Sequence, residues 1–163
     1  MKRALIISFL LYITLLAASQ ETPLNSGWKA KRVSEVSLDG FQLTAEDPEL
    51  AGWMNATVPG TVLTTMVKNG LFPDPWYGLN NNEIPDVYEA GRDYYTFWYF
   101  TRFSSESLDS TRQVWLNFRG INYRAEIYLN GKLISDGVHE GMFLRKKINV
   151  TSILNNKGPN RLA

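Results

Sequence analysis

Cysteine is absent from the 163-residue sequence, and histidine occurs only once, as His139. Without cysteine the chain has no disulfide bonds and no thiolate metal ligands, so its stability must come from packing. A single histidine also excludes a cluster of histidine ligands. We therefore predict neither a metal site nor a cofactor, and we expect His139 to be a polar loop residue rather than a catalyst.

An excess of charge of either sign is also missing. The formal net charge is +1, and without Lys2 and Arg3 the remaining 15 basic residues face 16 acidic ones. Nucleic-acid-binding domains present a basic surface, so this balance argues against a nucleic-acid partner. Aromatic residues, by contrast, make up 13% of the chain, with five Trp and eight Tyr. They suit both the core of a β-sandwich and stacking on sugar rings.

The one long hydrophobic run lies at the N-terminus. Two basic residues precede an apolar run from Ala4 to Leu16, and small residues follow it as far as Ser19. This order is typical of a secretory signal peptide, so we predict a leader over residues 1–19 and a mature domain over residues 20–163. A membrane anchor is the alternative, but the run is short for a span and lacks a basic flank. We expect a secreted or periplasmic protein with no stable membrane anchor after cleavage.

Short alternating segments separated by turns dominate the mature chain and predict an all-β fold. The strongest is Tyr94–Phe103, where aromatic residues on both faces indicate that both faces are covered. Asn130-Gly131 predicts a tight hairpin. Other strands are expected at Trp28–Val36, Phe41–Thr44, Trp53–Val58, Val114–Arg119, Tyr123–Leu129, Lys132–Ile134 and Phe143–Val150. Asn160–Ala163 is expected to open a strand that the chain cuts off, leaving an unpaired sheet edge and a truncated domain.

One short helix and one long loop complete the pattern. Apolar residues at helical spacing follow Thr61, and Asn69-Gly70 ends the helix with residues that tolerate the left-handed conformation. We expect an antiparallel jelly-roll β-sandwich with this helix as a lid on one end. The loop, Leu71–Gly91, carries Trp76, Tyr77 and three consecutive asparagines. Long loops inside compact domains are usually functional or disordered, and the aromatic residues argue against disorder.

Three stretches of sequence carry a resemblance to a known family. The first runs from Val58-Pro59-Gly60-Thr61 to Pro73-Asp74-Pro75-Trp76-Tyr77-Gly78, the second is Gly91-Arg92-Asp93-Tyr94-Tyr95, and the third runs from Leu116 through Asn130-Gly131 to Gly141-Met142-Phe143. Together they resemble the N-terminal, galactose-binding-like sugar-binding domain of family-two glycoside hydrolases. The first two are most similar to plant-type endo-β-mannosidases and exo-β-glucosaminidases, and the resemblance covers about Leu24 to Ala163.

The resemblance implies a jelly-roll domain of a secreted, retaining β-glycosidase that acts on β-linked mannoside or glucosaminide glycans. In that family a pair of glutamates in a later (β/α)8 barrel performs hydrolysis, with the carboxyl groups roughly 5–5.5 Å apart. We therefore expect no catalytic residue in this chain, no activity from it alone, and the parent's barrel domain as its partner. A stand-alone carbohydrate-binding module or lectin-like protein of the same fold is the alternative.

The resemblance also implies that the long loop borders the active site. Its substrate-binding candidates are Asp74, Trp76, Tyr77 and Asn80. The competing interpretation is a rigid turn whose aromatic residues plug the end of the sandwich. Trp98 and Trp115 have the same two interpretations, sugar stacking and core packing, and their mid-strand positions favour the core. The scattered carboxylates are not expected to form a catalytic pair: Glu83, Asp86, Glu89, Asp93, Glu126 and Glu140.

Two sequence motifs fit the pattern for asparagine-linked glycosylation. They are Asn55-Ala56-Thr57 and Asn149-Val150-Thr151, and both fall in predicted strands. We therefore name Asn55 and Asn149 as candidate glycosylation sites.

Overall fold

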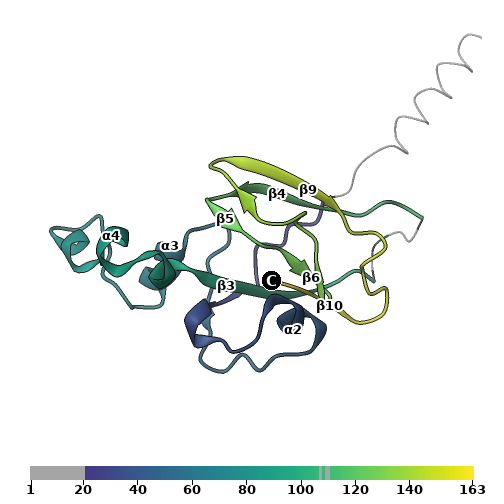
Figure 1. Cartoon of the computed structure of the whole chain (residues 1–163), viewed down its shortest axis with the longest axis horizontal. Helices are drawn as coiled ribbons and strands as arrows, with labels where there is room; N and C mark the ends of the chain where they lie inside the picture. Colours follow the sequence, from purple (N-terminus) through teal and green to yellow (C-terminus); the bar gives the residue numbers. More distant parts are fainter. Residues whose placement is uncertain (1–20, 107, 109–110) are drawn as a thin grey trace, which may run out of the picture.

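The computed structural model describes residues 21–106, 108 and 111–163 (Figure 1). The predicted leader, residues 1–19, lies outside the described residues. Within the described part of the chain, no helix is long and apolar enough to cross a membrane.

A six-stranded antiparallel sheet forms the larger layer, in the order β2-β1-β3-β10-β6-β7. Its strands are β1 (Lys29–Arg32), β2 (Met54–Asn55), β3 (Phe97–Ser104), β6 (Tyr128–Leu129), β7 (Lys132–Leu133) and β10 (Pro159–Leu162). The strand expected over Tyr94–Phe103 begins only at Phe97, because Arg92–Tyr95 forms a 3-10 turn, η3. The expected strands at Trp28–Val36 and Trp53–Val58 are likewise shorter in the structure, and the first is followed by a 3-10 turn, η1 (Val33–Glu35).

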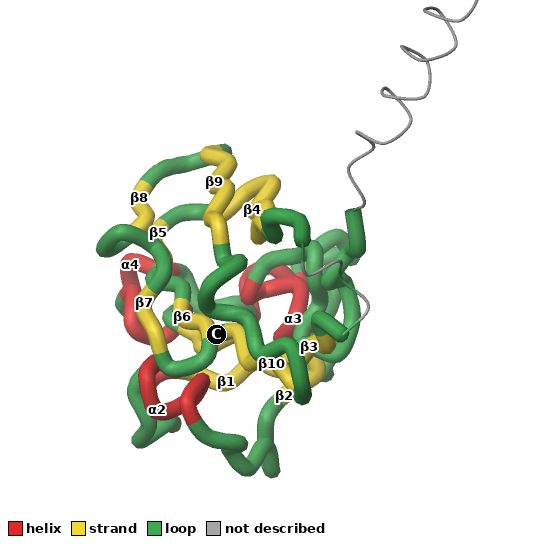
Figure 2. The backbone as a smooth tube through the Cα atoms, turned by 90° about the vertical axis from the view of Figure 1, so that its right-hand side faces the viewer, coloured by secondary structure: helices red, strands yellow, loops and turns green. Residues whose placement is uncertain are grey.

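Two short antiparallel pairs form the second layer. One joins β4 (Trp115–Ile121) to β9 (Leu144–Asn149), and the other joins β5 (Arg124–Ala125) to β8 (His139–Glu140). Figures 1 and 2 show β4 and β9 above the large sheet. Leu116, Phe118 and Ile148 pack from this layer against a buried cluster that includes Leu129 and Leu162 of the large sheet. Burial of these apolar side chains between two layers is what holds a sandwich together.

A helix, α2 (Gly40–Ala45), covers the other face of the large sheet and corrects the strand expected at Phe41–Thr44. Asp39 caps it: its Oδ1 accepts from the Gln42 amide at 2.8 Å, while Gln42 Oε1 accepts from the Asp39 amide at 3.0 Å. This reciprocal capping box nucleates a helix where alternation alone favours a strand. Leu43 is buried, and Phe41 packs edge-on against the ring of Tyr128.

The expected short helix is present as α3 (Val62–Lys68), at the end of β3 beside the long loop. The Thr61 hydroxyl accepts from the Thr64 amide at 3.0 Å and caps its start. Gly70, at φ 75°, ends it, and the Gly70 amide donates to the carbonyl of Val67. The Thr65 hydroxyl meets the Tyr99 hydroxyl at 3.3 Å and ties the helix to β3. With α2 and a third helix in the long loop, the structure has more helices than expected.

The hairpin predicted at Asn130-Gly131 joins β6 to β7, with both turn residues at positive φ as the twist of a two-residue hairpin demands. Asn130 also binds the strand beside it, because its Oδ1 accepts from the Arg161 amide at 2.9 Å. That strand, β10, is the one expected at Asn160–Ala163. It lies between β3 and β6, so the strand itself is an interior strand and not a sheet edge. The antiparallel sandwich predicted from the sequence is confirmed.

Candidate functional site

The long loop forms an arm, residues 71–96, that extends beyond the end of both layers (Figure 1). Its first half is a series of tight turns built on Asp74. The Asp74 Oδ1 accepts from the Trp76 amide at 3.0 Å, and the Asp74 carbonyl accepts from both the Tyr77 amide and the Asn80 Nδ2. A 3-10 turn, η2 (Asn80–Glu83), follows. Asp74 is thus the residue that folds the tip of the arm.

The second half of the arm returns through a one-turn helix, α4 (Val87–Ala90), to η3. Asp86 caps α4, since its Oδ1 accepts from the Tyr88 amide at 2.7 Å. The Tyr95 hydroxyl donates to the Pro85 carbonyl and closes the base of the loop. Burial, the nearby Tyr94 and the charge of Asp86 raise the pKa of Tyr95 against the opposing effect of Arg32, so the phenol keeps its proton and stays a donor.

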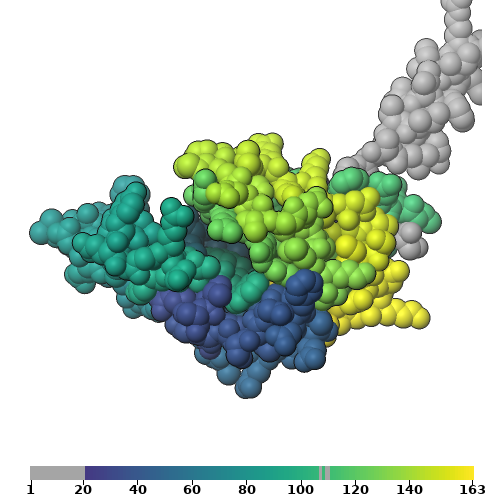
Figure 3. Space-filling view, viewed as in Figure 1, coloured from purple at the N-terminus to yellow at the C-terminus, as the bar shows by residue number. Residues whose placement is uncertain are grey.

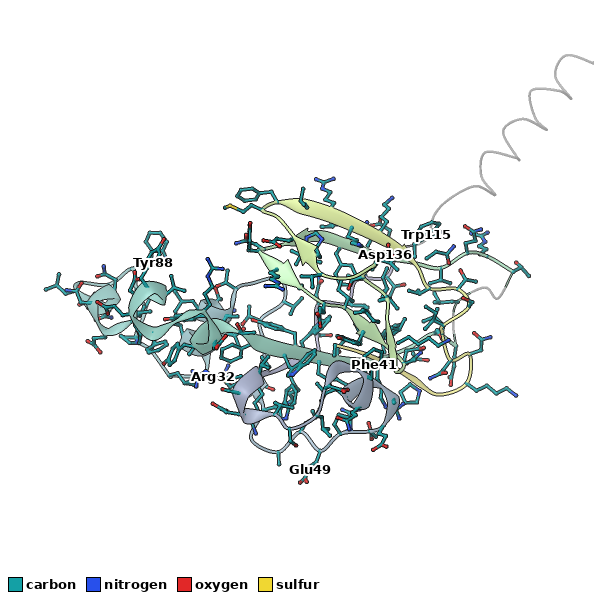
Figure 4. All side chains as sticks on the ribbon, in the orientation of Figure 1. Arg32, Phe41, Glu49, Tyr88, Trp115 and Asp136 are labelled. Atoms are coloured by element: carbon teal, nitrogen blue, oxygen red, sulfur yellow. The ribbon has the colours of Figure 1, made fainter. Side chains whose placement is uncertain are left out.

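Arg32, on β1, anchors the arm to the large sheet. Its Nε donates to the Tyr94 carbonyl at 2.9 Å, and its guanidinium lies 4.2 Å from the centre of the Tyr94 ring. A cation over an aromatic face is attractive, and more so when partly desolvated. Figure 4 shows Arg32 where the arm meets the sheet and Tyr88 projecting upward from α4 in the arm.

The aromatic residues of the arm face solvent in this chain. Trp76 and Tyr88 are each 95% exposed, and Tyr77 and Leu79 are each 77% exposed. The interpretation of the loop as a plug for the sandwich end is therefore wrong for Trp76 and Tyr77. Side chains that contribute nothing to this domain's core, yet are large and apolar, suggest a surface that another body covers.

Asn80 differs from its exposed neighbours. It is partly buried, and its Nδ2 is already used at 3.0 Å on the Asp74 carbonyl. Asparagine carries both a donor and an acceptor, so its Oδ1 remains available to a hydroxyl. The structure thus holds the amide in a fixed orientation, whereas its contact with a sugar stays a prediction.

The space-filling view shows the surface hollowed between the arm and the upper layer (Figure 3). Figure 1 shows α4 in the arm and β5 at the near end of the upper layer, the two parts of the chain between which this hollow lies. Large apolar side chains at the turns flanking these strands are also exposed: Tyr123, Met142 and Phe143. Exposed apolar residues therefore occur both on the arm and at the turns of the neighbouring upper layer.

A separate open hollow of about 220 Å³ lies beside Trp53, between η1 and the loop that contains Pro48 and Glu49. It includes none of the predicted substrate-binding residues. Its volume is below the roughly 300–1,000 Å³ of typical ligand pockets. In the part of the chain that the structure describes, the arm and its recess are the better candidate for a functional surface.

The remaining sequence candidates divide between core and surface. Trp98 packs edge-on against Tyr128, as the core interpretation predicts. Trp115, by contrast, is 51% exposed on the outer face of β4, so the core interpretation is wrong for this residue.

His139 is only 8% exposed and lies in β8, so the expectation of a loop residue is wrong. Glu126 accepts from the Tyr128 hydroxyl at 2.7 Å, a local structural contact. No group of three or more metal-ligating side chains occurs among the described residues.

Both candidate glycosylation sites are exposed, and each is the last residue of a strand. Asn55 is the last residue of β2, and its Oδ1 accepts from Lys29 Nζ at 2.7 Å. Asn149 is the last residue of β9, and its Oδ1 accepts from both the amide and the hydroxyl of Thr151.

Comparison with known proteins gives this geometry a context. The chain is 51% identical over 143 residues to the mannosylglycoprotein endo-β-mannosidase of Lilium longiflorum, covering 86% of this chain and 15% of the lily protein. It is 24% identical over 151 residues to an exo-β-D-glucosaminidase of Streptomyces avermitilis, covering 92% of this chain and 16% of that protein. The chain thus spans about a sixth of the length of these relatives.

Solved structures of similar fold point the same way. The exo-chitosanase of Amycolatopsis orientalis superimposes with a TM-score of 0.73 at 24% identity, covering 88% of this chain and 16% of that one. A β-D-mannosidase from Dictyoglomus thermophilum superimposes with a TM-score of 0.63 at 30% identity, covering 88% of this chain and 15% of that one. A family model described as the glycosyl hydrolase 2 galactose-binding domain-like family matches residues 28–163. The chain belongs to this family of galactose-binding-like domains of family-two glycosyl hydrolases.

Proposed function

We propose that this chain is the non-catalytic N-terminal module of an exported, retaining β-glycosidase that hydrolyses β-linked mannosides or glucosaminides. The exposed aromatic arm is the observation that carries the proposal. Trp76, Tyr77 and Tyr88 have no packing role in this domain. Exposed side chains of this kind forgo the stabilisation that burying their apolar surface would give. We infer that the barrel domain of the parent covers this surface.

The similarity to longer enzymes supports a parent of this kind. The relatives are named for action on β-mannosides or β-glucosaminides, and this chain matches about a sixth of their length. The pair of carboxyl groups that a retaining hydrolase needs, one as acid/base and one as nucleophile, would then come from the barrel. This chain supplies shape and contacts at the rim of the sugar site.

The chemistry of the arm suits that role. Aromatic rings present a flat apolar face to the C–H side of a pyranose, and the fixed amide of Asn80 presents an acceptor to a hydroxyl. The turns around Asp74 and the anchor at Arg32 hold these groups in place before a sugar arrives. A preorganised loop loses less conformational entropy on binding, which favours affinity.

The purified chain alone should release no aryl group from aryl β-mannosides or aryl β-glucosaminides. The physical reason is that the acid and nucleophile are supplied from outside this module. The measurement is the release rate against a buffer blank, in a preparation free of host glycosidases. Turnover that follows the chain through successive purification steps would contradict the non-catalytic assignment.

In the full-length parent, Trp76→Ala should lower kcat/KM. Loss of a desolvated contact with the sugar or with the barrel costs about 1–3 kcal/mol, or roughly 5- to 150-fold. The Tm of the isolated chain should change little, because Trp76 is 95% exposed there. Asn80→Ala tests the rim separately, because it removes the amide oxygen offered to the sugar together with the hydrogen bond from Nδ2 to the Asp74 carbonyl.

Trp115→Ala is the matched control, since it removes an exposed tryptophan from the outer face of β4, away from the arm. It should leave kcat/KM unchanged. If Trp76→Ala and Asn80→Ala keep full activity in the parent but lower the Tm of the isolated chain, the arm has only a structural role.

A lectin-like protein of the same fold is the second candidate, and reading the gene downstream of Ala163 separates the two. An open frame that continues into a barrel with two catalytic glutamates supports the enzyme module. A stop codon directly after a completed strand, together with glycan binding by the isolated chain, supports the lectin.

Export is part of the proposal and has its own test. N-terminal sequencing of the protein secreted by a eukaryotic or bacterial host should give Gln20 as the first residue, as expected for cleavage after Ser19. Recovery of the intact chain in the membrane fraction would support an anchor instead.

A further inference from the structure

The outer face of β4 and β9 combines a glycosylation motif with an exposed tryptophan. Asn149 and Trp115 are direct cross-strand partners in the β4–β9 register. Side chains directly opposite each other in an antiparallel pair point to the same face, with Cβ atoms about 4.5–5.5 Å apart. Trp115 is 51% exposed, whereas the neighbouring partners Leu116 and Ile148 pack against the buried core. Figure 4 labels Trp115 on this upper layer.

A hydrogen-bond network fixes which end of the Asn149 amide faces solvent. The Thr151 hydroxyl accepts from the Val114 amide at 2.8 Å and donates to Asn149 Oδ1 at 2.7 Å. The Thr151 amide also donates to Asn149 Oδ1 at 3.0 Å. The oxygen is thus held by two donors, and within the described residues Nδ2 makes no hydrogen bond. Nδ2 is the atom that carries the sugar in an asparagine-linked glycan.

The other motif lacks this arrangement. The cross-strand partner of Asn55 is Lys29, and Lys29 Nζ donates to Asn55 Oδ1. The amide of Thr57 donates to the Thr65 hydroxyl, away from Asn55. Asn55 therefore has a charged, flexible side chain directly opposite it instead of a tryptophan, which makes this site an internal control.

We propose that Asn149 carries an N-linked glycan and that its first N-acetylglucosamine packs on the indole ring of Trp115. The apolar side of the pyranose then covers an aromatic face that is otherwise in water, which favours the folded state. The inference rests on the export step of the proposed function, because the oligosaccharide is attached only in a secretory pathway.

The test expresses the full chain in a glycosylating eukaryotic host, with the host's own secretion signal in front so that the result does not depend on residues 1–19. Peptide mass spectrometry after peptide N-glycosidase should find Asn149 converted to Asp in the enzyme-treated sample only. An unmodified Asn149 in the secreted protein overturns the proposal.

Two enzymatic treatments then isolate the role of the first sugar. An endoglycosidase that leaves a single N-acetylglucosamine should preserve the Tm of the glycosylated form. Peptide N-glycosidase, which removes every sugar, should lower it by about 2–4 °C. Asn149→Asp keeps the oxygen that accepts from Thr151 and cannot be glycosylated, so it should match the fully deglycosylated form.

Trp115→Ala separates stacking from a general effect of the glycan. It should remain glycosylated at Asn149 but lose the Tm difference between the single-sugar and sugar-free forms, whereas Asn55→Gln should keep that difference. Nuclear Overhauser contacts between the sugar and the indole protons give a second readout. The packing on Trp115 is overturned if the single-sugar and sugar-free forms differ in Tm equally in Trp115→Ala and in the unchanged chain. It is also overturned if these two forms of the unchanged chain have the same Tm.

Discussion

At the scale of single residues, burial and a neighbouring carboxylate change the ionisation of Tyr128. It lies buried between Phe41 and Trp98, and its hydroxyl donates to Glu126 at 2.7 Å. Burial, the hydrogen bond to Glu126, and the charges of Glu126 and Asp39 raise the pKa of Tyr128 to about 12. In an unfolded chain a tyrosine has a pKa of about 10. The folded state therefore holds this proton more tightly than the unfolded state does.

The stability of the chain should fall as pH rises from about 10 to about 12. Below pH 10 the full contribution of Tyr128 is present, and it is lost as pH rises through the folded pKa. Tyr128→Phe keeps the ring but removes the ionisable group, so its Tm should decline less over this interval. Differential scanning measurements of both proteins between pH 9 and 12 check this.

Glu126→Gln tests the part of the Tyr128 pKa shift that comes from the charge of Glu126. It keeps an acceptor for the Tyr128 hydroxyl but removes the negative charge, so tyrosinate absorbance should develop at lower pH than in the unchanged chain. If the Tm of the unchanged chain and the Tm of Tyr128→Phe decline in parallel, other groups govern the loss of stability at alkaline pH. Tyr99, whose pKa is also raised by burial, is one such group.

Single-residue environments were the least predictable part of the molecule. Trp98 and Trp115 both stand within strands, yet one packs in the core and the other faces outward, because β3 is covered on both faces and β4 on one. Alternation gives the relative side of each residue but not which side meets another layer. His139 was expected in a loop, but it lies in β8 opposite Ala125 of β5 and is buried.

At the scale of elements, α2 shows how closely a helix approaches the sheet. A Cβ added at Gly40 would lie 2.3–2.6 Å from three atoms of the Tyr128 ring. The ring cannot move aside freely, because Phe41 and Trp98 contact it edge-on. Gly40 is therefore required for close approach.

Gly40→Ala should destabilise the chain by about 1–3 kcal/mol through overpacking. Gly120→Ala is the matched control, since a Cβ at Gly120 in β4 meets no atom within 4 Å. Urea unfolding should show a lower midpoint for the first variant and almost none of that loss for the second. Equal midpoints for Gly40→Ala and the unchanged chain would mean that α2 can shift on the sheet without cost.

The elements themselves were predictable where local chemistry and alternation agree. Asn130-Gly131 and the helix ending at Asn69-Gly70 were placed correctly, because positive-φ turns leave a clear sequence signal. The helix at Gly40–Ala45 was missed although Asp39 and Gln42 have the spacing of a capping box. The exposure of Trp76 was not predictable from the sequence, because the alternation that shows core contacts ends where the arm begins.

At the scale of the whole molecule, the sandwich was predictable but its strand order was not. The order β2-β1-β3-β10-β6-β7 brings the last described strand between β3 and β6, which sequence neighbours do not reveal. In this register Leu162 lies opposite Thr101, and the Ala163 amide and carbonyl both pair with Tyr128. A residue placed after Ala163 along the same strand would run beside the first half of β3.

That half of β3, Phe97–Tyr99, has a ladder to β1 on one side, and in the described chain no strand pairs with it on the other. Extending the chain by the parent's next residues, about 5–6 for one strand length, should therefore raise the Tm and the solubility. The gain should come from backbone hydrogen bonds and from covering aromatic side chains of β3. A Gly-Ser tail of equal length is the control, because it lacks side chains to pack. If the parent's residues and the Gly-Ser tail give the same Tm as the unextended chain, β3 gains no further strand there.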